Sequence, residues 1–93
     1  MEIYDKAAWH IDAGEDEAAV IAKFQAVFSF LDEKRLLSED GKEILEFGID
    51  DSVSLNEDMV TEEGAAFLHR HYDEVINFDA DQISAELDSR YDS

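Results

Sequence analysis

The sequence predicts an all-α fold, a small single-domain bundle of four or five helices around a central helix at about residues 15–35. Residues 15–35 have helical apolar periodicity, with acidic side chains at the start and basic side chains at the end. Two later segments share one helix-start pattern. Proline is absent and only four glycines occur, which favours uninterrupted helices.

The composition is that of a folded, strongly acidic chain. Ninety-three residues suffice for one core, so we expect residues 1–93 to form a single domain. A hydrophobic content of 45% argues against disorder. The absence of cysteine excludes disulfides and thiol catalysis. No apolar run approaches the ~20 residues of a membrane span, and the acidic N-terminus does not fit a secretory signal. We expect a bacterial, cytoplasmic protein without membrane contact.

The first segment, residues 3–11, has apolar residues at four-residue spacing, which predicts a short helix. We expect its Trp9 to anchor the segment on the core. His10 is interpreted as a partly exposed structural histidine rather than a site residue.

The central helix has large apolar side chains on one face and alanines on the other. Phe24 is expected to be among the most buried residues, and the helix is expected to be covered on both sides. Asp12 with Glu15 matches a capping box, and Gly14 with Glu17 is an alternative start. The apolar face comprises Val20, Ile21, Phe24, Val27, Phe28 and Leu31, and the small face comprises Ala18, Ala19, Ala22 and Ala26.

A helix-start pattern then occurs twice, 23 residues apart. In each copy an apolar residue precedes Ser38 or Thr61, and two acids and a glycine follow. We predict that Ser38 and Thr61 are N-caps. A glycine inside a helix costs about 0.5–1 kcal/mol, so Gly41 and Gly64 predict that another backbone passes close by. The pattern is similar to helix starts in winged-helix domains, which hold DNA. Residues 36–68 contain ten acids and one base, so we do not expect that function here.

The segment between the two copies is predicted as a helix over about 39–47, ended by Gly48, and an ordered loop. Val53 and Leu55 alternate as in a strand, yet no second strand is evident, so we expect them to point inward from a loop. The acids of this loop do not follow the calcium-binding pattern of an EF-hand.

The last third predicts a helix over 62–76 and an apolar stripe over 80–91. His69 and His71 lie about 200° apart on the first helix, so they do not chelate one metal; we expect His69 to pair with Asp73. The stripe of Ile83, Leu87 and Tyr91 predicts a docked final helix, with a frayed tail as the alternative.

No catalytic motif can be assembled from this chain, so we expect neither an enzyme nor a cofactor or metal site. Twenty-five acids against seven bases give a net charge of −18, which disfavours direct contact with nucleic acid. One hypothesis is a small acidic binding protein, such as an immunity protein, an inhibitor or a nucleic-acid mimic, that neutralises a basic protein.

The alternative hypothesis is a structural or adaptor domain, monomeric or homodimeric, whose acidity serves only solubility. The distribution of acids, which are concentrated after the central helix, favours the binding hypothesis. The candidate partner-binding residues are Glu39, Asp40, Asp50, Asp51, Glu57, Asp58, Glu62 and Glu63.

Overall fold

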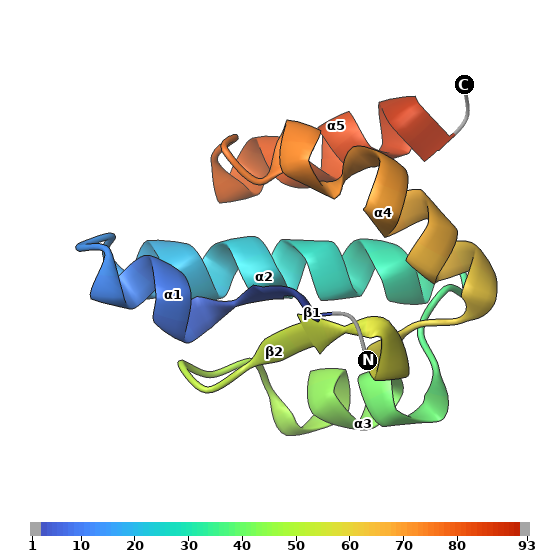
Figure 1. Cartoon of the computed structure of the whole chain (residues 1–93), viewed down its shortest axis with the longest axis horizontal. Coiled ribbons are helices and arrows are strands. Elements are labelled where there is room, and N and C mark those ends of the chain that lie inside the picture. The colour runs from blue at the N-terminus through green and yellow to red at the C-terminus, as the bar shows by residue number, and fades with distance from the viewer. Residues whose placement is uncertain (1–2, 92–93) are drawn as a thin grey trace.

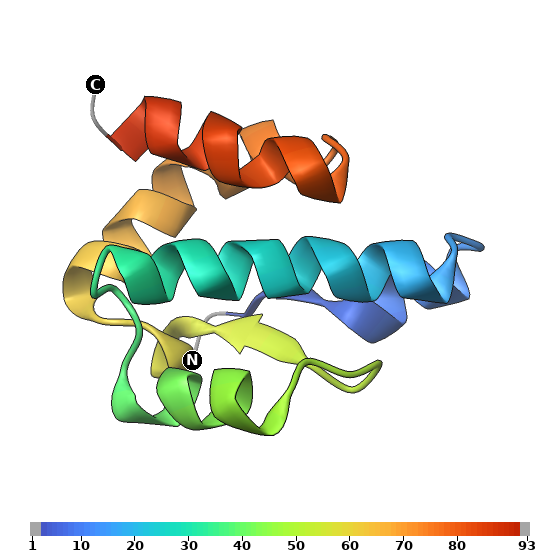
Figure 2. The ribbon, with the colours of Figure 1, turned by 180° about the vertical axis from the view of Figure 1, so that it is seen from behind.

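The long helix α2 lies in the middle of the molecule, between two groups of elements (Figures 1 and 2). The computed structural model describes residues 3–91. Helices α4 and α5 lie on one side of α2, and the strands β1 and β2 with helix α3 lie on the other. The elements are β1 (Ile3–Lys6), α1 (Ala7–Asp12), α2 (Glu17–Glu33), α3 (Glu39–Phe47), β2 (Ser54–Asn56), the 3-10 helix η1 (Glu57–Met59), α4 (Glu62–Val75) and α5 (Ala80–Tyr91). The predicted helical bundle is confirmed, with a small two-stranded sheet in addition.

The apolar face of α2 forms the centre of the core. Phe24, Phe28 and Leu31 are completely buried, as are their neighbours Val20 and Val27. Burial of a large apolar side chain stabilises a fold by roughly 1.5–3 kcal/mol. The periodicity of the sequence therefore identified the residues that hold the helix in place.

Helix α2 is covered on two sides, by α4 and α5 and by the strands with α3, but its alanine face is covered only in part. Ala18, Ala19 and Ala22 are exposed, whereas Phe30 near the end of the helix is buried. Phe30 stacks on Phe67, with ring centroids 5.8 Å apart. Alanine is a strong helix former that loses little when it stays in water, so an alanine face does not require a covering element.

Helix α2 starts later than either predicted capping residue. Asp16 is its N-cap and accepts a hydrogen bond of 3.0 Å from the backbone N–H of Ala19. Gly14 lies instead in the turn after α1, with φ of +96°, and its N–H bonds to the carbonyl of Ile11. A glycine with positive φ ends a helix more readily than it starts one, so Gly14 separates α1 from α2.

The first segment is only partly helical, which corrects the prediction for residues 3–11. Residues Ile3–Lys6 form strand β1, which pairs antiparallel with β2. Leu55, expected in a loop, lies in β2 opposite Asp5. The backbone N–H of Ala7 then donates to the carbonyl of Val53 at 3.1 Å. The pairing joins segments about fifty residues apart in the chain, and local periodicity does not report such a pairing.

Trp9 does not anchor the segment on the core. Its side chain is 53% exposed, and Ala7 is the buried residue of α1 instead. The ammonium of Lys6 lies 5.8 Å from the centroid of the Trp9 ring, a cation–π contact at the surface. The segment is held through its backbone and through the side chains of Asp5 and His10, described below.

The last two helices close the opposite side of the bundle. Leu68, Tyr72 and Val75 of α4 are buried, and so are Ile83 and Leu87 of α5. Helix α5 runs along α2, and Lys34 forms an ion pair of 2.8 Å with Asp88 across the contact. The apolar stripe of the tail is therefore a docked helix, and the frayed alternative is excluded for residues 80–91.

Candidate functional site

Both predicted helix caps are present, and they set the position of the candidate acidic residues. The hydroxyl of Ser38 accepts a hydrogen bond of 3.2 Å from the N–H of Gly41, and that of Thr61 accepts one of 3.1 Å from Gly64. The two caps satisfy backbone donors that the first turn of a helix otherwise leaves unpaired. The acids that follow each cap then lie in the first turn of α3 or α4 and point to solvent.

The two helix starts cross each other. Leu37 and Val60 form an isolated antiparallel bridge, and the N–H of Ser38 donates to the carbonyl of Met59 at 3.0 Å. A Cβ atom on Gly41 would lie 2.1 Å from the carbonyl oxygen of Met59, and one on Gly64 would lie 2.7 Å from that of Leu36. The prediction that another backbone passes close to each glycine is confirmed.

The crossing brings together the three elements that carry six of the eight candidate acids. These six occupy the starts of α3 and α4 and the short helix η1 between them. The remaining two, Asp50 and Asp51, lie in the loop beyond the opposite end of α3. All eight side chains are exposed. We call them the acidic surface: Glu39, Asp40, Asp50, Asp51, Glu57, Asp58, Glu62 and Glu63.

Three of the seven Lys and Arg side chains, Lys23, Lys34 and Arg90, pair with acids outside this surface. Lys23 lies 3.9 Å from Glu15. Arg90 contacts Glu86 at 2.8 Å and Glu74 at 3.3 Å. Within residues 3–91, by contrast, seven members of the acidic surface, all except Glu57, make no ion pair with another side chain. The negative charge of these seven side chains is therefore not neutralised by a basic side chain of residues 3–91.

Asp50 has a further reason to stay charged. Its carboxylate accepts hydrogen bonds from the hydroxyl of Ser52 at 2.6 Å and from the N–H of Ser52 at 2.9 Å. These hydrogen bonds hold the pKa of Asp50 below its ordinary value. The loop thus presents a fixed carboxylate.

An apolar groove lies beside Asp50, between α3 and β2. Its volume is about 270 Å³. Phe47 stands at its edge and is 89% exposed. This groove was not predicted from the sequence, in which Phe47 is assigned only to the end of a helix. A phenylalanine directly before a C-capping glycine, three residues after Ile44, was the available signal. The groove is lined by Ile44, Phe47, Gly48, Asp50, Ser52, Val53, Ser54 and Met59.

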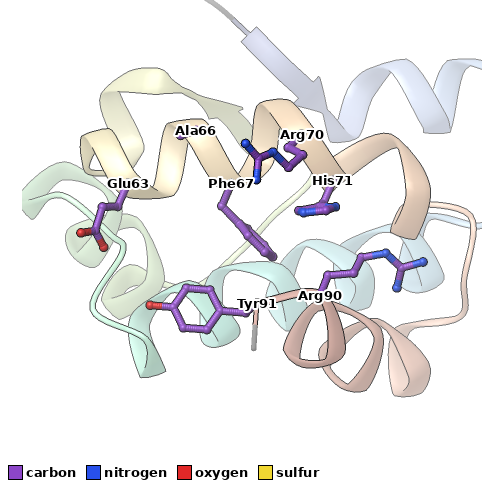
Figure 3. Close-up of a pocket in the computed structure, with 7 residues that line it drawn as sticks. All are labelled: Glu63, Ala66, Phe67, Arg70, His71, Arg90 and Tyr91. Carbon is purple, nitrogen blue, oxygen red and sulfur yellow. The ribbon is translucent and has the colours of Figure 1, made fainter. Parts of the chain in front are cut away.

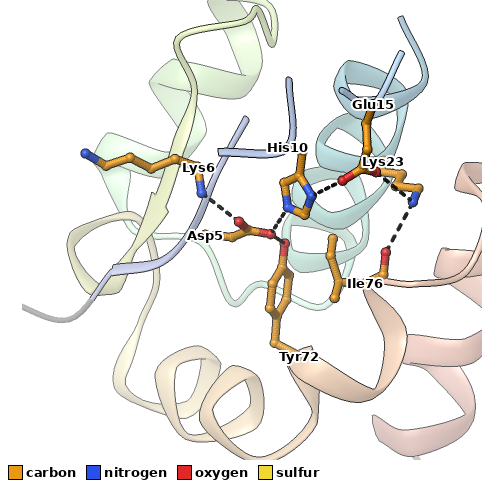
Figure 4. Close-up of polar contacts among 7 residues, drawn as sticks. All are labelled: Asp5, Lys6, His10, Glu15, Lys23, Tyr72 and Ile76. Carbon is orange, nitrogen blue, oxygen red and sulfur yellow. Dashed lines mark hydrogen bonds and ion pairs between the residues drawn. The ribbon is translucent and has the colours of Figure 1, made fainter. Parts of the chain in front are cut away.

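A separate polar network surrounds the N-terminal strand (Figure 4). The carboxylate of Asp5, only 6% exposed, accepts a hydrogen bond from the phenol of Tyr72 at 2.7 Å and lies 2.6 Å from Nε2 of His10. Nδ1 of His10 lies 2.7 Å from Glu15. Lys23 joins Glu15 to the carbonyl of Ile76 at 3.3 Å. The network ties β1, α1, α2 and α4 together.

The protonation states follow from these partners. Burial alone would lower the pKa of His10, but hydrogen bonds and charge from Asp5 and Glu15 outweigh it and raise that pKa. Burial and the charge of Asp5 raise the pKa of Tyr72 well above its ordinary value. His10 therefore holds its second proton more tightly than a free histidine does, and Tyr72 remains a donor to Asp5. This role agrees with the interpretation of His10 as a structural histidine.

A cavity of about 420 Å³ lies between α4 and the end of α5 (Figure 3). Its rings pack on each other, with Phe67 and Tyr91 at 5.6 Å between centroids. Two of its basic groups already have acidic partners, since His71 and Arg90 both contact Glu74. It is lined by Glu63, Ala66, Phe67, Arg70, His71, Arg90 and Tyr91.

Other classes of site find no support in the described part of the chain. Residues 3–91 contain no group of three His, Asp or Glu side chains that could hold a metal ion. Over the same residues, no helix combines the length and the apolar character needed to cross a membrane. Comparisons with family models, with curated proteins and with solved structures find no match for this chain.

Proposed function

We propose that this chain is a small acidic binding protein that neutralises a basic protein partner, in the manner of an immunity protein, an inhibitor or a mimic of nucleic acid. One observation carries the proposal. The acidic surface is exposed, and seven of its eight side chains lack an ion pair within residues 3–91, although bases elsewhere in the chain pair with other acids.

The uneven distribution of the basic residues along the chain favours a binding role over a role in solubility alone. A surface that only keeps molecules apart needs net charge, wherever that charge lies. Here residues 36–60 contain eight acids and a single base, Lys42. Such a concentrated field attracts a cationic partner and raises its association rate steeply at low ionic strength. A nuclease or another protein with a positive cleft is the class of partner that this field fits best.

The field also fits a protein partner better than a nucleic acid or an anionic lipid. Binding of phosphate groups needs clustered Lys and Arg side chains. Lys23, Lys34 and Arg90 are engaged with carboxylates. Three of the seven Lys and Arg residues therefore already have acidic partners, and residues 36–60 contain only one base, Lys42.

The proposal is tested by capture of a partner and by its association kinetics. Immobilised chain is incubated with lysate of the source organism at low salt, and bound proteins are identified by mass spectrometry. A four-site variant, Asp50→Asn, Asp51→Asn, Glu57→Gln and Asp58→Asn, is tested beside a matched variant that removes four exposed acids elsewhere: Asp12→Asn, Asp32→Asn, Glu33→Gln and Asp81→Asn.

We expect a basic protein that binds the wild type and the matched variant, and that associates more slowly with the four-site variant. Rim charges act mainly on the association rate, so the four-site variant should also show a flatter dependence on salt. Equal rates for the two variants, or the absence of any basic partner, would contradict the proposal and leave the solubility hypothesis.

A further inference from the structure

We infer that the partner inserts a bulky apolar side chain of a basic segment into the groove between α3 and β2, against Phe47. This inference rests on the proposed function and specifies how the partner is held. It starts from Phe47, which is 89% exposed, the largest exposure among the large apolar side chains of residues 3–91. A single exposed apolar residue is common in proteins, so the surroundings of Phe47 carry the argument.

The groove offers an apolar floor for an incoming side chain. Ile44, Val53 and Met59 line it beside Phe47, and each of the three is at least half-buried and packs against the core. A side chain placed there would be desolvated between a fixed floor and the ring of Phe47. Anchors of this kind, in which one bulky side chain fills a pocket, carry most of the energy of many protein interfaces.

The size of the groove limits what it can hold. At about 270 Å³ it is smaller than the ~300–1,000 Å³ of typical small-molecule pockets. It holds one large side chain rather than a whole ligand. The occupant is therefore a part of a larger molecule that is bound mainly by other contacts.

The charge around the groove defines the rest of the occupant. Asp50 lines the groove itself, Asp51 follows it, and Glu43 and Glu46 lie on α3. A second copy of this chain would bring the same net charge of −18 to the contact, and like charges that face each other cost several kcal/mol in general. A segment with Lys or Arg on both sides of its apolar side chain pairs with these acids instead.

The test uses two fluorescein-labelled oligolysine peptides, one with a central leucine and one with serine in its place. Affinity for each peptide is measured by fluorescence anisotropy at low salt. Wild type, Phe47→Ser and Trp9→Ser are compared; Trp9 is the matched control, since it is exposed but does not line the groove. Circular dichroism checks that each variant keeps its helices.

We expect the wild type to bind the leucine peptide about tenfold more tightly than the serine peptide, because the leucine is buried only in part of its surface. Phe47→Ser should remove most of this difference and leave the affinity for the serine peptide unchanged. Trp9→Ser should keep the difference. An equal preference for leucine in wild type and Phe47→Ser would overturn the inference.

The four-site variant distinguishes failure of the proposed binding function from failure of the groove as an anchor. The four-site variant that lacks Asp50, Asp51, Glu57 and Asp58 should bind both peptides more weakly. If the wild type binds neither peptide at low salt, both the proposed function and this inference are wrong. If charge matters but the central leucine does not, the function stands and the groove is not the anchor.

Discussion

The hydroxyl of Ser38 donates a hydrogen bond of 2.6 Å to the carbonyl oxygen of Asp58, twenty residues further along the chain. The same hydroxyl caps α3 by accepting from Gly41. One oxygen atom thus fixes the start of α3 and the position of η1, which together carry four members of the acidic surface, Glu39, Asp40, Glu57 and Asp58. The charged surface is therefore held in place by the fold.

Removal of the Ser38 hydroxyl should lower the free energy of unfolding more than removal of an ordinary helix cap does. We predict that Thr61→Ala lowers the free energy of unfolding by roughly 1 kcal/mol, and that Ser38→Ala lowers it further, because the second hydrogen bond is also lost. Urea unfolding measures both, with Ser89→Ala, exposed on α5, as the control. Equal stability of Ser38→Ala and Ser89→Ala would contradict the prediction.

The crossing of the two helix starts requires glycine at position 41. A Cβ atom there would lie 2.1 Å from the carbonyl oxygen of Met59, which is backbone and cannot rotate away. We predict that Gly41→Ala destabilises the fold by about 1–3 kcal/mol, although alanine is the better helix former. Lys42→Ala, exposed in the same helix, should change stability little. A stabilised Gly41→Ala would show that the two backbones are further apart.

Truncation to alanine should strongly destabilise the fold at Phe24 and should hardly change its stability at Phe47. Phe24 is completely buried and Phe47 is 89% exposed. We predict a loss of about 3–5 kcal/mol for Phe24→Ala, which a domain of this size can scarcely tolerate, and a change within about 0.5 kcal/mol for Phe47→Ala. Thermal unfolding of the two variants checks this. A large loss for Phe47→Ala would mean that its ring is part of the core.

Stability should fall with rising pH through the titration of His10. Asp5 and Glu15 raise its pKa in the folded chain above the ordinary value of 6.5. His10 therefore binds its proton more tightly in the folded chain than in the unfolded chain. The resulting stabilisation is fully present below pH 6.5 and is lost as the pH rises through the folded pKa.

The measurement is urea unfolding of wild type and His10→Gln over a pH series that starts below 6.5. The difference in free energy of unfolding between the two proteins should shrink as the pH rises. An NMR titration of the His10 ring gives its pKa directly, and Glu15→Gln should lower that pKa. A difference that grows with pH, or a His10 pKa below the ordinary value, would refute the assignment.

Features encoded by neighbouring residues were predictable from the sequence. The caps at Ser38 and Thr61 depend on three or four consecutive residues, and the burial of Phe24 depends on one helical face. The close backbones at Gly41 and Gly64 followed from the cost of glycine in a helix. The exposure of the eight candidate acids followed from their charge.

Features that join distant segments were not predictable in the same way. Strand β1 exists because β2 pairs with it, and the buried carboxylate of Asp5 is tolerated because Tyr72 and His10 bind it. In a chain with 25 acids, nothing local distinguishes Asp5 from the others. Whether Trp9 and Phe47 are buried depends on which elements pack beside them. Periodicity alone therefore does not predict that both side chains are exposed.

We propose that this chain binds a cationic partner through the surface formed by α3, the following loop, β2, η1 and the start of α4. The most direct test is an NMR titration of the isotope-labelled protein that follows the chemical shift of each backbone amide. The titrant is the captured partner or the leucine-containing oligolysine peptide. We predict that the largest shifts fall on residues 39–59, with Phe47 and Asp50 among them. Shifts confined to the second half of α4 and to α5, around the cavity beside Tyr91, would contradict this proposal.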